Sequence, residues 1–340
     1  MPPPSARPRR ATIRDVALEA GVSRGTVSRV LNGEPYVSAQ AREAIERAVA
    51  KVGYVPNTAA RNLARRRSQA VGIVVHEPHT LFLEDPNIGA ILLGANSALS
   101  ASDHQMVSLV IDSERDSRRV VRYLSGGFVD GVVVVSARRN DPLLSAVARL
   151  GIPAAVVGRP PGMPAVPFVA IDNRAAARSI TERLLATGRS RVGMVAAALD
   201  RDSGADRLAG FRAALGDRFD PDLVVSRSLY EYGTGRDGMA ELLAREPALD
   251  GVFAASDVVA AGALDALRAA GRRVPDDVGI VGFDDSAWAL RCQPLLSTVH
   301  QPAGELGRQA AEQVLAQLRG TPPALDGLLL DTYVVWRESA

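Results

Sequence analysis

The chain has 340 residues, of which 47% are hydrophobic and 23% charged, a composition typical of a globular protein with two or three domains. Its one cysteine, Cys292, excludes an intramolecular disulfide and favours a reducing compartment, and together with four histidines it offers no zinc-ligand spacing. The N-terminus lacks the apolar run of a signal peptide, and no stretch is apolar over the length of a membrane span, so we expect a cytoplasmic protein. We expect no metal and no cofactor.

The net charge of +2 combines two parts of opposite sign. Residues 1–67 contain 13 Lys and Arg against 5 Asp and Glu, a charge of +8, whereas the remainder contains 27 against 33, a charge of −6. A basic segment attached to an acidic body is typical of a protein that binds DNA. Residues 1–10 are rich in Pro and Arg and are predicted to be a disordered tail.

Residues 12–33 predict two short helices with a turn at Gly21. Apolar side chains recur at helical spacing on both sides of that turn, so the two helices can bury each other's stripes. Gly21 supplies the backbone freedom of a tight turn, and Ser23 can cap the second helix. The outward side chains are Arg24, Gly25, Thr26, Ser28 and Arg29. Arginine and hydroxyl groups suit base edges and phosphates, so the pattern predicts a DNA-reading helix-turn-helix, with an ordinary helical hairpin as the alternative.

A third helix is predicted over residues 39–52, with Ser38 as its cap, and completes an all-α head over residues 11–55. Pro56 then favours the start of another short helix over residues 57–64, which ends in three arginines. A basic helix with few apolar residues has little reason to fold alone, so residues 56–68 are predicted to be a hinge helix and linker that order on DNA.

From residue 69 onward, short apolar runs alternate with helical stretches. The predicted strands are residues 71–75, 105–111, 131–135, 154–157, 191–196, 223–226, 251–254 and 279–282. Runs of this kind, covered by helices on both faces, indicate parallel sheets. We expect an α/β body over residues 69–340 with two lobes and a small-molecule cleft between them. Lobe one comprises about 69–168 and 300–325, and lobe two about 169–297 and 326–337.

The head follows the pattern Thr-Ile-x-Asp-Val-Ala-x-x-Ala-Gly-Val-Ser-x-x-Thr-Val-Ser-Arg-Val-Leu-Asn, and the chain resembles the LacI/GalR (lactose repressor) family of bacterial transcription regulators over residues 11–337. The resemblance implies that Arg24, Gly25 and Arg29 face major-groove bases. Gly25 has no side chain to read a base, so specificity depends mainly on Arg24, for which a phosphate contact is the alternative. The implied DNA-binding set is Thr12, Ser23, Arg24, Gly25, Thr26, Ser28, Arg29, Asn32, Tyr54, Asn57, Ala60 and Leu63.

The segment from Tyr54 to Ala64 resembles the family's hinge helix, which enters the minor groove as a pair. Leu63 stands where the family has a leucine that wedges into a base step, and Ala60 stands at a groove-facing position. Packing of Leu63 on the body is the alternative.

For the body, the resemblance implies a periplasmic-binding-protein-like (type I) fold that dimerises and binds an effector between its lobes. Residues 199–211 are similar to the loop of a purine-binding family member, which assigns ligand contacts to Arg201 and Arg207. Ala205 stands where the lactose repressor has a sugar-binding arginine, a departure that argues against a lactose-like binding mode. A structural ion pair is the alternative for Arg207.

Further effector contacts are implied at strand ends and on loops. Asp284 matches the family's ligand-binding carboxylate and Asp257 another contact, with helix capping as the alternative for both. Tyr230 stands where relatives stack a ring on the ligand, with a core position as the alternative. His76, Phe82 and Asp85 follow a first-lobe strand at the mouth of the expected cleft, while Asp172 and Asn173 lie at the crossing between lobes and suit ligand or interlobe contacts equally.

The combined prediction is a repressor that binds near-palindromic operator DNA as a homodimer, or alternatively as a tetramer. Its effector is expected to be a sugar or a nucleoside or purine-like metabolite, acting as inducer or co-repressor. The competing functions are an effector-independent architectural regulator, a transport binding protein and an enzyme with a DNA-binding head. The enzyme is disfavoured because no phosphate loop, nucleophile elbow or metal cluster occurs, so no catalytic residue is predicted.

Overall fold

The computed structural model describes residues 11–31, 34, 36–54, 67–159, 162, 166–323 and 325–340. They form two compact units that divide between Arg67 and Ser68, each of which is described by itself. The predicted tail over residues 1–10 and the predicted hinge helix lie outside the described residues, apart from the end of its linker. None of the described helices combines the length and apolar character needed to span a bilayer.

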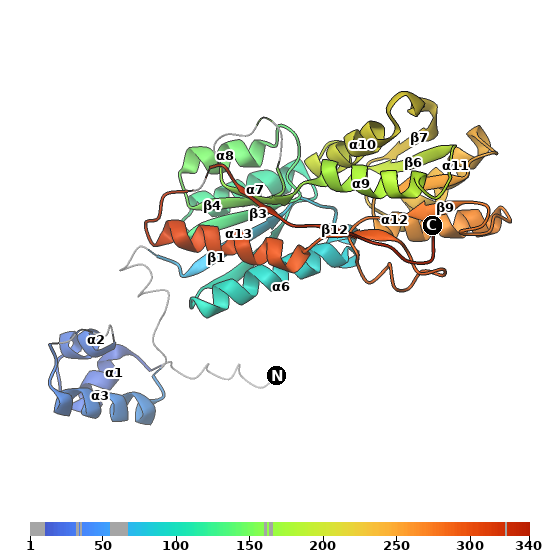
Figure 1. The fold of residues 1–340 in the computed structure, drawn as a ribbon. Helices are drawn as coiled ribbons and strands as arrows, with labels where there is room; N and C mark the ends of the chain where they lie inside the picture. The colour runs from blue at the N-terminus through green and yellow to red at the C-terminus, as the bar shows by residue number, and fades with distance from the viewer. Residues whose placement is uncertain are drawn as a thin grey trace, which may run out of the picture. The chain divides into compact units, whose positions relative to one another are not determined.

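The head consists of three helices, α1 (Ile13–Ala20), α2 (Arg24–Leu31) and α3 (Ala39–Val52) (Figure 1). Their facing stripes bury a small core made of Val16, Ala17, Val27, Val30, Ile45 and Ala48. Gly21 has a φ of 66°, which gives the backbone the left-handed conformation needed to leave α1. The predicted helices, turn and apolar stripes of the head are therefore confirmed.

Hydroxyl caps start the second and third helices as the sequence predicts. The Ser23 hydroxyl accepts a hydrogen bond from the Thr26 backbone N–H at 3.1 Å, and the Ser38 hydroxyl accepts one from Ala41 at 3.3 Å. Each bond satisfies an amide that the helix itself leaves unpaired at its N-terminus.

The first lobe of the body is a six-stranded sheet in the order β11-β5-β4-β3-β1-β2, with all neighbours parallel. Its strands are β1 (Ala70–Val75), β2 (Gln105–Val110), β3 (Gly131–Val135), β4 (Ala154–Val157), β5 (Phe168–Ile171) and β11 (Leu328–Leu330). Its helices are α5 (His79–Glu84), α6 (Pro86–Ala101), α7 (Glu114–Ser125), α8 (Pro142–Leu150) and α13 (Ala303–Leu318).

The second lobe is a four-stranded parallel sheet in the order β7-β6-β8-β9. Its strands are β6 (Val192–Ala197), β7 (Val224–Arg227), β8 (Gly251–Ala254) and β9 (Gly279–Val281). Its helices are α9 (Asn173–Leu185), α10 (Asp202–Leu215), α11 (Tyr232–Arg245) and α12 (Asp257–Ala269), with 3-10 turns η1 (Gly216–Arg218) and η2 (Pro221–Leu223). A separate antiparallel pair, β10 (Thr298–His300) and β12 (Tyr333–Val335), lies near the crossings between lobes.

Each sheet is buried on both faces because successive residues of a strand point to opposite sides. Ile73 packs with α6 and α13 on one face of the first sheet, whereas its neighbour Val74 packs with α7 and α8 on the other. In the second sheet, Met194 faces α9 and α10, and Val195 faces α11 and α12. The predicted parallel α/β architecture is therefore confirmed.

The lobe boundaries differ from those predicted. Val156 of β4 pairs with Phe168, and β11 pairs with β5, so both β5 and β11 belong to the first sheet. The chain crosses to the second lobe after Ile171 and after Leu330, later than the predicted boundaries near residues 168 and 325. Short apolar strands fit either sheet equally well, and only the pairing partner assigns them.

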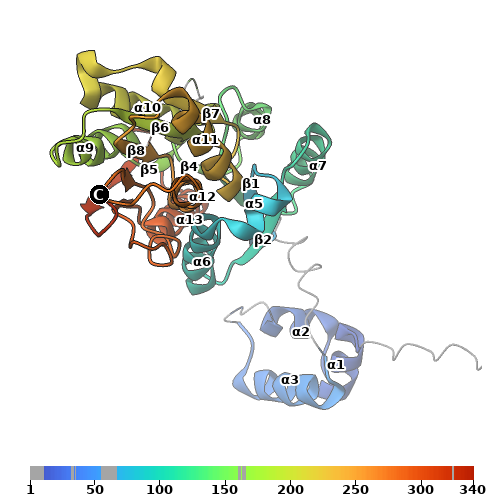
Figure 2. The same cartoon turned by 90° about the vertical axis from the view of Figure 1, so that its right-hand side faces the viewer.

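Glycines bring helices of the body into close contact. α6 and α13 lie side by side in both views (Figure 1 and Figure 2), and a Cβ on Gly94 would lie 1.8 Å from the carbonyl oxygen of Gly304. A Cβ on Gly235 of α11 would meet the Val259 oxygen of α12 at the same distance. These helix pairs fix the covers of both sheets, whose carboxyl ends form the site described next.

Candidate effector site and DNA-binding surface

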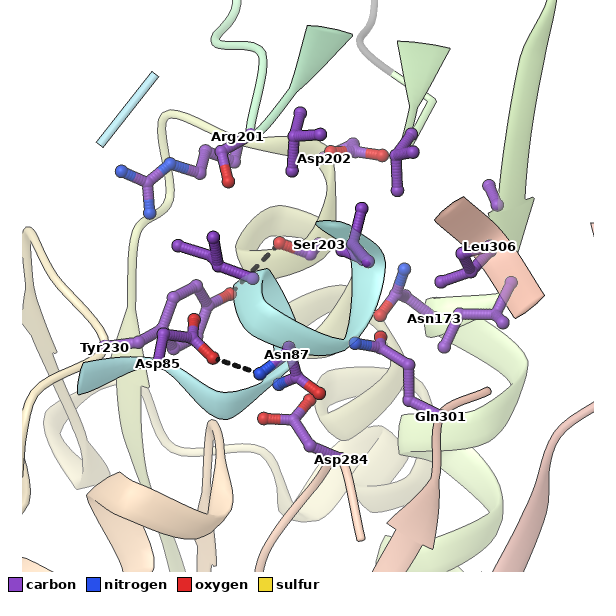
Figure 3. A pocket seen from close by; sticks show the side chains of 18 of the residues that line it. Asp85, Asn87, Asn173, Arg201, Asp202, Ser203, Tyr230, Asp284, Gln301 and Leu306 are labelled. Carbon is purple, nitrogen blue, oxygen red and sulfur yellow. Dashed lines mark hydrogen bonds between the residues drawn. The ribbon is translucent and has the colours of Figure 1, made fainter. Parts of the chain in front are cut away.

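A polar cavity of about 110 Å³ lies between the lobes, at the carboxyl ends of the strands (Figure 3). Its walls come from loops after β1, β3 and β4 and from the N-terminal part of α6 in the first lobe, and from loops after β6, β7 and β9 in the second. Ligand sites of parallel α/β sheets lie at these strand ends. The polar side chains of the lining are Glu77, Asp85, Asn87, Ser136, Asn173, Arg201, Asp202, Ser203, Arg207, Tyr230, Asp284 and Gln301.

Arg207 of α10 is buried and has an acceptor for each of its donor groups. Nε donates to the Asn173 side-chain oxygen at 3.0 Å, and one terminal nitrogen donates to the Ala255 carbonyl at 2.6 Å. The other terminal nitrogen donates to Asp284 at 3.1 Å and to the Gln301 side-chain oxygen at 3.3 Å. This guanidinium is held in one orientation by several elements at once.

Two aromatic rings complete the surroundings of Arg207. Its guanidinium carbon lies 3.7 Å from the centroid of the Phe283 ring and 5.6 Å from that of Tyr230. The Tyr230 hydroxyl and the Ser203 hydroxyl lie 3.2 Å apart (Figure 3), and burial raises the pKa of the phenol. Tyr230 therefore lines the cavity as a neutral ring with a polar tip.

Asp284 follows β9 in a strained backbone conformation, with a φ of 111°, and the next residue, Asp285, has a φ of 54°. Burial raises the pKa of Asp284 to about 7 although Arg207 opposes the rise. Burial and the nearby Asp284 charge raise the pKa of Asp257 to about 8. The second lobe thus holds two interacting buried carboxyl groups, one of which, Asp284, pairs with the Arg207 guanidinium.

Arg201 has very different surroundings from Arg207. One terminal nitrogen donates to the Glu77 carboxylate at 2.7 Å, and Glu77 belongs to the first lobe. Arg201 and Glu77 are 3% and 4% exposed, so this ion pair between the lobes is removed from water. The Nε and the other terminal nitrogen of Arg201 are buried and have no hydrogen-bond partner among the described residues.

The loop after β6 carries further contacts between the lobes. The Arg139 backbone N–H donates to the Asp200 carbonyl at 2.8 Å, and the Asp200 carboxylate lies 3.6 Å from the Arg138 guanidinium. The next acid, Asp202, accepts a hydrogen bond from the Arg159 backbone N–H, and burial raises its pKa. Residues 200–202 therefore contact the loops after β1, β3 and β4.

The predicted effector residues Arg201, Arg207, Tyr230 and Asp284 line the cavity, as do the further candidates Asp85 and Asn173. Three others do not. The His76 ring nitrogen Nδ1 lies 2.7 Å from Asp141, and Phe82 packs against the core. Asp257 accepts hydrogen bonds from the Thr298 hydroxyl at 2.6 Å and from the Ser286 backbone N–H at 2.7 Å. Asp257 therefore braces the loop after β9 instead of reaching the cavity.

Several lining residues were absent from the predicted site. Glu77 lies two residues beyond β1, where the strand-end rule would have found it. Asp85, by contrast, is the first-lobe candidate that does line the cavity, and its carboxylate also accepts from the Asn87 backbone N–H at 2.8 Å as the cap of α6. Gln301 follows β10, a three-residue strand that was not predicted from the sequence because it contains no apolar run.

In the head, Arg24, Gly25 and Arg29 are exposed on α2. The Ser23 and Thr26 hydroxyls lie 2.9 Å apart, and Ser28 is half-buried. The Thr12 hydroxyl donates to Asp15 at 2.7 Å, and Tyr54 packs partly into the head core. The other predicted DNA contacts lie outside the described residues: Asn32, Asn57, Ala60 and Leu63.

The three-helix head and the two-lobed α/β body with a polar cavity define the class of transcription regulators that join a helix-turn-helix to a periplasmic-binding-protein-like body. Residues 12–57 match the family of bacterial regulatory proteins called lacI, and residues 181–340 match the periplasmic binding protein-like domain. The chain belongs to the lacI family and is a DNA-binding transcriptional regulator.

Relatives and solved structures span nearly the whole chain. The HTH-type transcriptional regulator CelR of Thermobifida fusca is 42% identical over 338 residues, covering 98% of this chain and 99% of its own. The ribose operon repressor of Halalkalibacterium halodurans is 32% identical over 323 residues, covering 95% of this chain and 92% of its own.

Among solved structures, a complex of the transcriptional regulator CelR with cellobiose has a TM-score of 0.77 at 40% identity, covering 97% of this chain and 100% of its own. A Lac repressor dimer bound to operator and an anti-inducer has a TM-score of 0.86 at 25% identity, covering 97% of this chain and 99% of its own.

Proposed function

We propose that this protein is a repressor that binds a near-palindromic operator as a homodimer and is controlled by an uncharged carbohydrate bound between the lobes. The observation that carries the effector class is the chemistry of the cavity lining. Four carboxyl groups, Glu77, Asp85, Asp202 and Asp284, share it with two guanidinium groups, and burial raises the pKa of all four acids.

Vicinal hydroxyls match such a lining because each hydroxyl can donate to a carboxylate and accept from a guanidinium. A carboxyl group accepts from a hydroxyl when it is ionised and donates to one when it is protonated, so the raised pKa values keep this match. An anionic ligand would meet four acidic groups against two basic ones. Asp284, Asn87 and Gln301 present acceptors and donors close together (Figure 3), and Tyr230 offers a ring face for the apolar side of a sugar. The relatives support this choice, since one acts on a ribose operon and a similar regulator was solved with cellobiose.

The cavity volume of about 110 Å³ bears on how a ligand enters. Pockets for small molecules usually measure about 300–1,000 Å³. A disaccharide therefore requires the lobes to separate, and ligand binding is coupled to the contacts that the loop after β6 makes with the first lobe. Through such lobe movement, an effector alters operator affinity.

For the DNA interaction, we assign base reading to Arg24, with Arg29 as a second contact and Leu63 as the minor-groove wedge. The exposure of Arg24 and Arg29 on α2 supports the first two assignments. A guanidinium paired with guanine contributes about 1–3 kcal/mol of discrimination. Because its DNA target lies in the bacterial cytoplasm, the protein acts there, as a regulator and not as an enzyme.

One experiment tests the effector assignment. Thermal unfolding is measured with a panel of sugars, nucleosides and nucleobases, because a ligand at 100 times its dissociation constant adds about 2.7 kcal/mol of stability. Fluorescence anisotropy with labelled operator DNA then determines whether the ligand weakens or strengthens binding. Stabilisation by a nucleobase and not by any sugar would replace the carbohydrate with a purine-like effector, and no response to any compound would favour an effector-independent regulator.

A second experiment tests base reading. Arg24→Ala should relax the base preference at one position of each half-site, measured by binding to operators with single substitutions. Arg42→Ala is the matched control, since Arg42 lies on α3 outside the reading helix. A loss of affinity that is equal for every operator would assign Arg24 to phosphate instead.

A further inference from the structure

We propose that Glu77 determines the charge class of the effector: by neutralising Arg201 it makes that end of the cavity select uncharged ligands over anionic ligands of similar shape. The inference rests on the proposed carbohydrate effector and specifies how the same site rejects sugar acids and sugar phosphates. Glu77 was absent from the predicted site, and neither residue of the pair contacts the Arg207 cluster through a hydrogen bond described here.

Glu77 and Arg201 form a buried ion pair in the wall of the cavity. The Glu77 carboxylate lies 2.7 Å from a terminal nitrogen of Arg201, and both side chains line the cavity. The side chains are only 5% and 3% exposed, so water screens their mutual attraction poorly. Without the negative charge of Glu77, the same location would hold a buried cation without an ionic partner.

Arg201 retains hydrogen-bond donors without acceptors. Its Nε and second terminal nitrogen are buried without an acceptor in the described part of the chain. An unpaired buried donor costs about 1–3 kcal/mol, so this guanidinium retains a strong demand for oxygen acceptors. A ligand carboxylate or phosphate would meet that demand best, and the charge of Glu77 is what penalises it.

The other carboxyl groups of the lining have hydrogen-bond partners of their own. Asp284 already shares its charge with Arg207, while Asp85 and Asp202 accept from backbone N–H groups. Burial raises the pKa of Glu77 and the Arg201 charge opposes that rise, which is consistent with a pair whose charges depend on each other. Asp85 and Asp202 are present in every variant of the test, so a difference between variants reports the charges of Glu77 and Arg201.

The test uses the full chain and two probes of similar shape, cellobiose and cellobiouronate, in which the hydroxymethyl group of the non-reducing residue is a carboxylate and both rings are kept. Their dissociation constants are measured by calorimetry. Wild type should prefer cellobiose. Glu77→Gln should shift the ratio of the two constants by about tenfold or more toward cellobiouronate, a change of about 1.4 kcal/mol. The double variant Glu77→Gln with Arg201→Gln removes both charges and should restore the wild-type preference.

Two further variants keep the result interpretable. Asp200→Asn removes a carboxylate from the same loop outside the cavity lining and should leave the ratio unchanged. Glu77→Asp retains the charge and should retain the preference for cellobiose, which keeps the inference testable if Glu77→Gln does not fold. An unchanged ratio in Glu77→Gln, or an anion-preferring Glu77→Asp, overturns the role of Glu77. Binding of neither probe by wild type overturns the inference for these ligands, whereas the carbohydrate assignment itself falls only if no sugar of the thermal panel stabilises the protein.

Discussion

Arg201 and Arg207 are six positions apart in the sequence, but their guanidinium groups differ in how many hydrogen-bond acceptors surround them. Arg207 donates to Asn173, Ala255, Asp284 and Gln301. Arg201 donates to the Glu77 carboxylate of the other lobe, and its two remaining donor groups are unpaired within the described structure. Three of the Arg207 acceptors come from the second lobe, which carries Arg207 itself, so that end of the site is organised whether or not the lobes approach.

The difference shows that one end of the site keeps its hydrogen bonds when the lobes separate, whereas the other end has its ion pair only when the lobes are together. A guanidinium with all its donors paired cannot rotate without losing several hydrogen bonds, whereas Arg201 exchanges one bond for water when the lobes separate. We therefore propose that the Arg207 end orients the ligand and that the Arg201 end couples the lobes. Each of the following predictions tests one side of this contrast.

The largest expected effect is that of Arg207→Met, which leaves Asp284 as a buried carboxylate without its counter-charge. We expect the free energy of unfolding to fall by about 3–5 kcal/mol, measured by urea denaturation. Arg201→Met is the matched variant and should cost less than about 2 kcal/mol, because lobe separation returns Glu77 to water. Equal losses for the two variants would remove the contrast between the two ends.

The second effect concerns pH. Burial raises the pKa of Asp284 to about 7 and that of Asp257 to about 8, against 3.8 for an ordinary aspartate. The folded state therefore binds more protons than the unfolded state from about pH 4 to 8, so these groups make stability fall as pH rises, by up to about 1.4 kcal/mol per pH unit for each proton. Asp257→Asn should flatten this slope in denaturation series from pH 5 to 8.

A control distinguishes this slope from ordinary carboxylate titration. Hydrogen bonds from Arg308 and Gln309 lower the pKa of Glu305 to about 2, so its contribution is present above its unfolded pKa and is lost as pH falls toward 2. Glu305→Gln should therefore leave the slope between pH 5 and 8 unchanged. If Asp257→Asn behaves like this control, the buried carboxyl groups do not govern stability in that range.

A smaller effect is expected for Asn173→Ala, which removes the acceptor of the Arg207 Nε at 3.0 Å. The unpaired donor should lower the free energy of unfolding by about 1–2 kcal/mol, again by urea denaturation. Gln301→Ala removes a longer contact of 3.3 Å and should cost less. A larger loss of stability for Gln301→Ala than for Asn173→Ala would mean that the hydrogen bond to Gln301 contributes more to holding Arg207 in place.

The smallest effect belongs to the rim of the Arg201 end. Asp200 and Arg138 are 3.6 Å apart with side chains 48% and 35% exposed, so Asp200→Asn should cost less than about 1 kcal/mol. The loss should disappear at high salt because screening already weakens an exposed ion pair. A large or salt-independent loss would show that the loop after β6 remains bound to the first lobe and does not separate from it.

Much of the fold follows from local sequence patterns. The strand predicted at residues 251–254 is β8 to the residue, and the valine-rich run at 131–135 is β3. Long apolar runs bounded by turns identify such strands without knowledge of their partners. Among the described three-residue strands, β9 was predicted, whereas β10, β11 and β12 were not. These three form by pairing with each other or with β5, segments that lie far apart along the chain.

The cavity was only partly predictable. Arg201, Arg207, Tyr230 and Asp284 were found because they stand in motifs that resemble a known family. Glu77 stands in no such motif, and the sequence around it resembles any loop after a strand. A carboxylate that lines a cavity and one that faces solvent have the same local pattern, so the assignment needs the opposite wall.

The sequence by itself determined the basic head, the helix-turn-helix pattern and the alternation of strands and helices, because charge and periodicity depend on neighbours along the chain. The tertiary structure alone decided which sheet receives β5 and β11 and which carboxylate meets Arg201. Glu77 and Arg201 are 124 positions apart, and their hydrogen bond exists because two separately folded lobes bring the ends of their strands together. Contacts of that kind depend on the packing of whole lobes, which no segment of the sequence encodes locally.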